Sequence, residues 1–193
     1  AMMCKPQSGA ESALQDRSRK FVCMGGTHME QLRTAEELYA YSCDHNFGKG
    51  FGRNWGIRNF RLLETKLEKS EYAFLTFVGL HEFHSMSSHQ RNFAYAITNR
   101  RILMGQVRTF GRIRFRAVPL NEIQNISFDH DNSIGVMKLM LSQDAVTVGM
   151  SQETAAALSE KLAELLPVIQ ELARQLCADS DAAQTPDQED AAD

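Results

Sequence analysis

The sequence predicts an α+β fold in which seven short antiparallel strands are followed by one C-terminal helix and preceded by a small helical lobe. From about residue 70 the apolar residues recur with period two, which is typical of strands. From residue 151 they recur at helical spacing. The 193 residues, 43% hydrophobic and 23% charged, fit an ordinary soluble globular protein with one domain plus appendages.

Four segments follow one another along the chain. Residues 1–28 show no sustained period and contain Pro and Gly, so we expect them to be disordered or weakly ordered. Residues 29–69 are interpreted as the small helical lobe, and residues 70–177 as the domain of strands and helix. Residues 178–193 consist mainly of Asp, Ala and Gln, which predicts a disordered acidic tail.

The helical lobe begins with a capping signal. Thr34 followed by Glu37 matches a capping box, in which each side chain accepts from a free backbone N–H group at the helix start. A glycine-rich stretch at 46–56 holds Trp55, and residues 57–68 resume helical spacing. The glycines lack the preceding strand and the Gly-Lys-Ser/Thr step of a P-loop, so we interpret them as a turn between two helices.

The strands alternate with short turns. Asn99, Gly111 and the stretches at 130–133 and 142–144 supply the turn residues. Both faces of several strands are apolar, as expected of a sheet that is covered on both sides. The expected strands are at about 72–83, 92–98, 101–109, 114–119, 123–129, 134–142 and 145–150.

The C-terminal helix has a broad apolar stripe and a Ser151 cap. Pro167 removes one backbone hydrogen bond and is expected to kink or break the helix near residue 166. Beyond Cys177 the helical pattern ends.

The net charge of −3 hides two unlike parts. The tail carries six acidic residues and no basic one, so the rest of the chain is mildly basic. These residues are Asp179, Asp181, Asp187, Glu189, Asp190 and Asp193.

Arginines concentrate in residues 91–116, a window without Asp or Glu. Guanidinium groups at turns and on exposed strand faces could attract the phosphates of phospholipid headgroups or nucleic acids. The alternative is solvated arginines paired locally with Glu64, Glu68, Glu82 or Glu122, or with the tail. The candidate binding residues are Arg91, Arg100, Arg101, Arg108, Arg112, Arg114 and Arg116.

Metal and catalytic chemistry find little support in the sequence. His81 and His84 would point to opposite faces of a strand, so the sequence does not bring them and His89 together as the three or four convergent ligands of a metal site. The serines at 85, 87 and 88 lack a G-x-S-x-G motif and a clear orienting acid. The four cysteines are scattered, which indicates free thiols in a reducing compartment. We therefore expect no enzyme activity, no metal and no cofactor.

The stretch FAYAITNRRILMGQ at 93–106 resembles the signature hairpin of bacterial PH-like domains of the YokE type and of the related GRAM domains. RAVPLNEIQNISFDHDNSIGVMKLML at 116–141 is similar to the segment that follows in those domains. The resemblance covers about residues 70–172 and implies a PH-like seven-stranded antiparallel β-barrel, or orthogonal sandwich, capped by the C-terminal helix. The family carries no catalytic residues that could be transferred to this chain.

The resemblance implies a binding or scaffolding module without enzyme activity. We expect a protein partner on the arginine-rich hairpin, with pairing at an exposed strand edge as one route. Peripheral binding to anionic membrane lipids is the alternative, although the first loop between strands, the usual basic site of the superfold, holds only Arg91 and histidines here. A nucleic-acid partner is not expected, homo-oligomerisation stays open, and the absence of a signal-like or membrane-spanning segment favours the cytoplasm.

Overall fold

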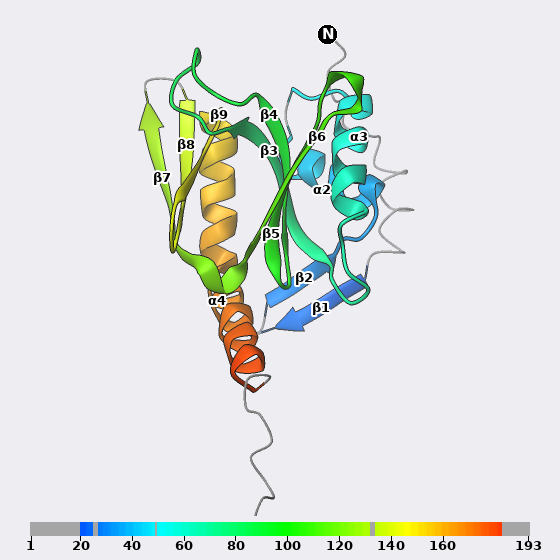
Figure 1. Cartoon of the computed structure of the whole chain (residues 1–193), viewed down its shortest axis with the longest axis vertical. Coiled ribbons are helices and arrows are strands. Elements are labelled where there is room, and N and C mark those ends of the chain that lie inside the picture. The colour runs from blue at the N-terminus through cyan, green and yellow to red at the C-terminus, as the bar shows by residue number, and fades with distance from the viewer. Residues whose placement is uncertain (1–19, 25–26, 49, 132–133, 183–193) are drawn as a thin grey trace, which may run out of the picture.

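The computed structural model describes residues 20–24, 27–48, 50–131 and 134–182, and the predicted fold class is confirmed. One seven-stranded antiparallel sheet curls into a half-barrel and is capped by a long C-terminal helix (Figure 1). The strand order is β6-β5-β4-β3-β9-β8-β7, so β6 and β7 are the two edges. The strands are β3 (Ala73–His81), β4 (Asn92–Thr98), β5 (Arg101–Val107), β6 (Ile113–Pro119), β7 (Ile123–Asp131), β8 (Ile134–Leu141) and β9 (Ala145–Ser151).

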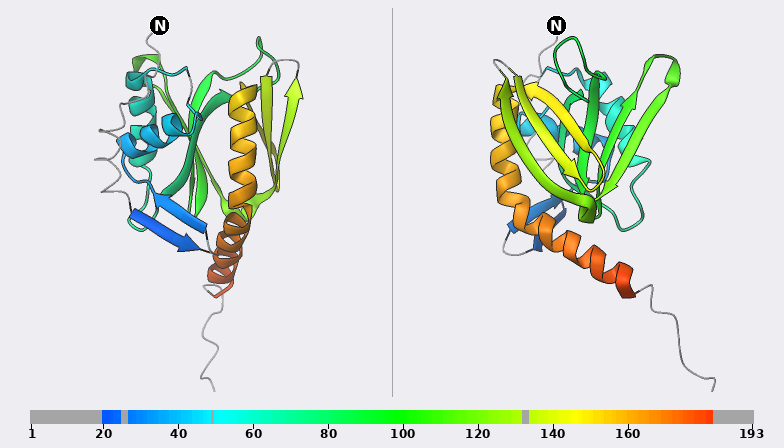
Figure 2. Two further views of the ribbon diagram at one scale, coloured as in Figure 1. Left: turned by 180° about the vertical axis from the view of Figure 1, so that it is seen from behind. Right: turned by 60° about the vertical axis from the view of Figure 1, so that its left-hand side comes forward.

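Helices cover both sides of the sheet. The helices α2 (Ala35–Asp44) and α3 (Arg53–Glu64) pack on β3, β4 and β5, and α4 (Gln152–Ala182) packs on β7, β8 and β9 (Figure 2). The 3₁₀ turns η2 (Thr109–Gly111) and η3 (Leu120–Glu122) lie at the two ends of β6. Because β3, β4 and β5 are covered on both faces, nearly all of their side chains are buried.

The predicted starts of α2 and α4 are confirmed, whereas α3 begins at Arg53, inside the glycine-rich stretch expected to be a turn, and ends at Glu64, so Trp55 lies on the helix. Glu37 N–H donates to the Thr34 hydroxyl, and the Glu37 carboxylate accepts from Thr34 N–H at 2.9 Å, which completes the capping box of α2. The N–H group of Thr154 donates to the Ser151 hydroxyl at 3.2 Å at the start of α4. Helix α4 continues through Pro167 as one element and bends along its length, so the proline kinks the helix and does not break it (Figure 2).

Two terminal stretches differ from the prediction. Residues 20–31, expected to be without regular structure up to residue 28, form a hairpin of β1 (Lys20–Met24) and β2 (Thr27–Gln31). A tertiary contact holds this hairpin, because Leu32 exchanges backbone hydrogen bonds with Ala73 at the start of β3 and Met29 is buried. Such a contact leaves no local period in the sequence. The rest of the segment predicted to be disordered, residues 1–19 and 25–26, lies outside the described residues.

The predicted acidic tail also begins later than residue 178, because α4 extends to Ala182. Adding residues to an existing helix is inexpensive, since nucleation is already complete, and this outweighs the acidic composition of the first tail residues. Residues 183–193 of the predicted tail lie outside the described residues.

Candidate functional site

The seven candidate arginines divide by what their guanidinium groups contact. Some form ion pairs with carboxylates, one donates to a neutral amide, and the rest have no acidic partner among the described residues. The first group is Arg100, Arg101 and Arg116, the second is Arg114, and the third is Arg91, Arg108 and Arg112. The seven arginines, which the sequence predicted as one binding surface, therefore fall into three groups with different contacts.

Arg101 pairs with a fully buried carboxylate. Its Nε lies 3.0 Å from Oε1 of Glu71, and its Nη2 lies 2.8 Å from Oε2, a bidentate geometry. The Glu71 side chain is 0% exposed. It also accepts hydrogen bonds from the Thr98 hydroxyl at 2.7 Å and from the backbone N–H of Glu68 at 3.0 Å. Arg101 thus neutralises a buried charge inside the fold.

The electrostatics of Glu71 follow from these contacts. Burial by itself raises the pKa of Glu71, but the hydrogen bonds from Arg101, Glu68 N–H and Thr98, together with the charge of Arg101, outweigh burial. The net result is a pKa below the usual range for glutamate. The carboxylate is therefore ionised at neutral pH and depends on Arg101 for its countercharge.

The turn between β4 and β5 is tied to the start of β3. The side-chain oxygen of Asn99 accepts from Tyr72 N–H at 3.1 Å, and Asn99 N–H donates to the Tyr72 carbonyl at 3.1 Å. Arg100 donates to the Glu68 carboxylate at 2.6 Å and to the Ser70 hydroxyl at 3.1 Å. Glu68 is one of the glutamates that the sequence offered as local partners. This end of the hairpin is therefore a built structural junction.

Arg116 joins the two arms of the curled sheet. Its Nη2 lies 2.9 Å from each carboxylate oxygen of Asp144, in the turn between β8 and β9. Arg114, two residues earlier on β6, donates to the side-chain carbonyl of Gln90. Because β6 and β7 are the two edges of the sheet, the Arg116–Asp144 pair bridges strands that share no backbone hydrogen bonds.

Exposed apolar side chains gather on the β5–β6 loop and the β6 edge. Phe110 is 97% exposed, Ile113 is 59% exposed and Phe115 is 36% exposed. Ile113 and Phe115 alternate with Arg114, so they lie on the opposite face of β6 from it. Lys66 lies over the Phe115 ring, 5.4 Å from its centroid. The edge thus offers free backbone groups, apolar side chains and one arginine whose described side-chain partner is a neutral amide.

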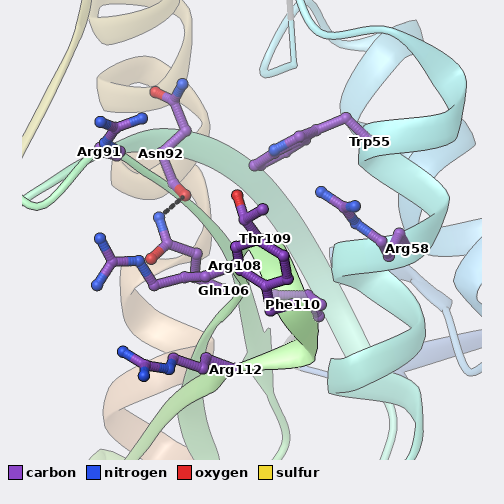
Figure 3. Close-up of a pocket in the computed structure, with 10 residues that line it drawn as sticks. Trp55, Arg58, Arg91, Asn92, Gln106, Arg108, Thr109, Phe110 and Arg112 are labelled. Atoms are coloured by element: carbon purple, nitrogen blue, oxygen red, sulfur yellow. Dashed lines mark hydrogen bonds between the residues drawn. The ribbon is translucent and has the colours of Figure 1, made fainter.

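The unpaired arginines line a hollow of about 560 Å³ between α3 and the β5–β6 loop (Figure 3). Among the described residues, its lining contains four arginines and no acidic residue. In Figure 3, Trp55 and Arg58 project from α3 toward the loop, and Arg91, Arg108 and Arg112 lie across from them. The lining residues are Trp55, Arg58, Arg91, Asn92, Gln106, Val107, Arg108, Thr109, Phe110 and Arg112.

Two buried contacts set the position of α3 against the loop. Asn59 is fully buried, and its side-chain oxygen accepts from Val107 N–H at 2.8 Å while its amide donates to the Trp55 carbonyl at 2.8 Å. At Gly105 a Cβ atom would lie 2.7 Å from a methyl carbon of Leu63, so only glycine allows this approach of α3 to β5. Trp55 and Arg58 therefore stand beside the end of β5 on a rigid support.

Gln106 lies at the wall of the hollow with one polar atom unsatisfied. Its side-chain amide N–H groups donate to the carbonyls of Asn92 at 2.8 Å and Gln90 at 3.3 Å, which fixes the orientation of the amide. Its Oε1 is buried and has no hydrogen-bond donor among the described residues. A buried acceptor without a donor is costly, and a hydrogen-bond donor on a bound group would remove that cost.

The backbone of the hollow is strained at two positions. Arg91 has φ of 69° and Phe110 has φ of 60°, and both lie in the left-handed region that non-glycine residues rarely adopt. Non-glycine residues with such backbone angles concentrate at binding and catalytic sites. Asn46 and Glu82, outside the hollow, also have positive φ, so this feature accompanies the hollow without being confined to it.

The histidines of the first loop do not converge. His81 is buried, its Nδ1 lies 2.8 Å from the Tyr95 hydroxyl, and burial with the charges of Arg116 and Arg114 lowers its pKa to about 4. His89 accepts from the backbone N–H of Arg91 at 2.9 Å. Within the ranges that the structure describes, no group of three or more His, Cys, Asp or Glu side chains is placed to hold a metal.

Several residues of these sites were missed by the sequence reasoning. Glu71 and Asp144 belong to ion pairs that span 30 and 28 positions, which no local pattern reveals. Arg58 follows Trp55 by three residues on the helix, so both lie on one face, and this spacing was an available signal. Gln106 and Phe110 carried no signal of their own, because strand and turn positions do not show which side chains line a hollow.

Comparison with known proteins identifies a family for more than half of the chain. Residues 67–164 match the family described as bacterial PH domain. A structural match is a DUF1696 family protein with a pleckstrin-homology domain from Shewanella loihica PV-4, with a TM-score of 0.39 and 14% sequence identity. That match covers 58% of this chain and 88% of the other. No curated protein matches the sequence.

A helix that crosses a bilayer must be long and apolar. Among the helices of the described segments, none is both long and apolar enough to cross a membrane.

Proposed function

The chain belongs to the bacterial PH domain family, and on that premise we propose that it is a non-enzymatic binding module whose β6 edge takes up an extended, acidic segment of a partner protein. The observation that carries the proposal is the β6 edge itself. It combines a free strand edge with exposed Ile113 and Phe115, and with Arg114 on the other face.

Strand addition suits these features. A partner segment that pairs with β6 would satisfy backbone N–H and C=O groups that face no strand of the described sheet. Apolar residues of that segment would lie beside Ile113 and Phe115, and alternating acidic residues would lie beside Arg114. Cross-strand pairs of this kind contribute roughly 0.2–1 kcal/mol each.

A second copy of this chain fits the edge less well. An antiparallel pair of β6 strands would bring Arg114 and Arg116 of one copy against the same arginines of the other. Like charges placed opposite each other destabilise a sheet. Charge complementarity therefore favours an acidic partner segment over self-association through this edge.

A selection from random peptides displayed on phage tests the proposal. With the full chain immobilised, the expected winners alternate acidic and apolar residues and bind less to the Ile113→Ser/Phe115→Ser double variant, which removes the apolar contacts without adding charge. Leu166→Ser is the matched control, because Leu166 is an exposed apolar residue on α4, away from the edge. Winners that lack this alternation, or that bind the double variant equally well, would contradict strand addition.

Peripheral binding to anionic membranes is the second candidate function. The exposed Phe110 at the loop tip, between Arg108 and Arg112, favours it, because an apolar side chain flanked by cations suits the headgroup region of an anionic bilayer. Co-sedimentation with phosphatidylglycerol vesicles over a salt series tests it. Binding that weakens with salt and falls in Phe110→Ser supports this candidate, and no binding at low salt removes it.

A further inference from the structure

We propose that the hollow between α3 and the β5–β6 loop binds a small ligand that carries both an aromatic ring and phosphate groups, as a nucleoside diphosphate does. The observations are Arg58, Arg91, Arg108 and Arg112 around one space, aromatic residues at its rim, and the unsatisfied Oε1 of Gln106 in its wall. This ligand site is separate from the β6 edge.

The charge of the hollow calls for an anion. Four arginines line one space, and none of the described residues that line it is acidic. By contrast, Arg61 on the solvent side of the same helix α3 pairs with Glu36 at 2.9 Å. Guanidinium groups match phosphate oxygens through paired hydrogen bonds, so a ligand with two phosphate groups fits this cluster better than a single carboxylate.

The aromatic part follows from Trp55 and Phe110. Both line the hollow, and Phe110 is almost fully exposed on a strained backbone. Figure 3 shows the guanidinium of Arg58 directed toward the space between these two rings. Aromatic faces exposed beside cations are suited to stacking with a planar ring, a contact worth roughly 1–3 kcal/mol for a base.

The unsatisfied acceptor selects a ligand that also carries a donor. Both amide N–H groups of Gln106 are held by backbone carbonyls, so the Oε1 can only accept. Inorganic phosphate ions have few donors at neutral pH, whereas sugar hydroxyls and ring amino groups have several. The volume of about 560 Å³ lies in the range of small-molecule sites, roughly 300–1,000 Å³.

Two residues of the hollow lie outside the segment that matches the bacterial PH domain family. Trp55 and Arg58 precede the matched segment, which begins at residue 67. The hollow therefore combines two residues of the N-terminal helical lobe with the β5–β6 loop of the PH domain. We infer that ligand binding here is a property of the lobe and the domain together.

The fluorescence of Trp55 reports on the site directly, because it is the sole tryptophan of the chain. The full chain is titrated separately with ADP, adenosine, inorganic phosphate, pyrophosphate and phosphatidylglycerol vesicles. We expect ADP to change the fluorescence and to bind about tenfold more tightly than adenosine or pyrophosphate, because it alone has both parts. Arg58→Gln and Arg91→Gln should each weaken ADP binding about tenfold.

The controls separate the site from general charge effects. Arg61→Gln removes a cation of the same helix outside the hollow and should leave ADP binding unchanged, as should the neutral change Ile113→Ser. Circular dichroism shows whether each variant is folded. An equal effect of Arg61→Gln and Arg58→Gln would overturn the proposal.

The probes also distinguish the sources of phosphate. Pyrophosphate binding as tight as ADP binding would overturn the aromatic part of the proposal. Binding of the phosphatidylglycerol vesicles together with no binding of ADP would show that the hollow takes lipid headgroups instead. Absence of binding by every probe would overturn the site. Loss of peptide binding in Ile113→Ser/Phe115→Ser with intact ADP binding would show that the two proposals stand or fall separately.

Discussion

The two ends of strand β5 carry arginines in opposite settings. At the β4–β5 turn, Arg100 and Arg101 contact Glu68 and the buried Glu71. At the β5–β6 loop, Arg108 and Arg112 have no acidic partner among the described residues and face a hollow. The same residue type thus stabilises the fold at one end and remains available for a ligand at the other. What decides the role is whether the chain places a carboxylate opposite the guanidinium.

The comparison is tested most strongly by removing Arg101. Arg101→Met leaves the buried Glu71 without its countercharge, and we expect the free energy of unfolding to fall by about 3 kcal/mol. Arg112→Met, at the other end, should change it by less than about 0.5 kcal/mol. Urea denaturation of both variants measures the difference. Similar losses in both would contradict a structural role confined to the turn.

A second variant separates the buried charge from lost packing. Arg101→Met/Glu71→Gln removes the charge together with its partner, and a neutral amide is less costly to bury. We therefore expect the double variant to recover part of the stability lost in Arg101→Met. If it is no more stable than Arg101→Met, the loss comes from packing of the arginine stem.

The pH dependence of this loss has a definite sign. The pKa of Glu71 is lower in the folded state than its ordinary value of 4.5, so its contribution is present above that value and is lost as pH falls through the folded pKa. Without Arg101 the buried Glu71 has a higher pKa than in the wild type, so the gap between wild type and Arg101→Met should shrink as pH falls through the range between the variant's pKa and the lowered wild-type pKa. His81, whose pKa is lowered to about 4, weakens both proteins as pH falls from 6.5, and its effect cancels in the difference.

Denaturation curves at a series of pH values measure this gap. A gap that widens in acid would contradict the assignment of Arg101 to an ionised Glu71.

An intermediate effect is expected at Arg116. Its bidentate pair with Asp144 is partly exposed, and such pairs contribute about 0.5–1 kcal/mol. Arg116→Met should lower the unfolding free energy by that amount, with a smaller loss at high salt. Hydrogen exchange of amides in β6 and in the β8–β9 turn should rise together if the pair holds the two arms of the sheet. Independent changes would argue against the bridge.

The smallest effect, with the opposite sign, is expected at the hollow. Arg58, Arg91, Arg108 and Arg112 repel one another, so Arg108→Gln should raise the unfolding free energy by roughly 0.3 kcal/mol at low salt. The gain should vanish at high salt, where charges are screened. Thermal unfolding over a salt series measures it. A loss of stability in this variant would indicate that Arg108 has a structural partner like that of Arg101.

The sequence predicted the order of elements because that order is written in local chemistry. Period-two alternation marked the seven strands of the sheet, the Thr34–Glu37 capping box marked the start of α2, and Ser151 marked the start of α4. Asn99 was identified as a turn residue, and its side chain does hold the turn. Each of these signals acts over a few residues, so a single sequence is sufficient to show it.

Only the tertiary structure decided what each arginine does. The partners Glu71 and Asp144 are distant in sequence, and the short β1–β2 hairpin depends on a contact with β3. The hollow exists because Asn59 and Gly105 bring α3 against the end of β5. Charge pairing and cavities depend on distances between segments that meet after folding. By itself, the sequence therefore determined the fold and the presence of an arginine-rich hairpin, and packing decided that the arginines at one end are paired with carboxylates while those at the other end line a hollow.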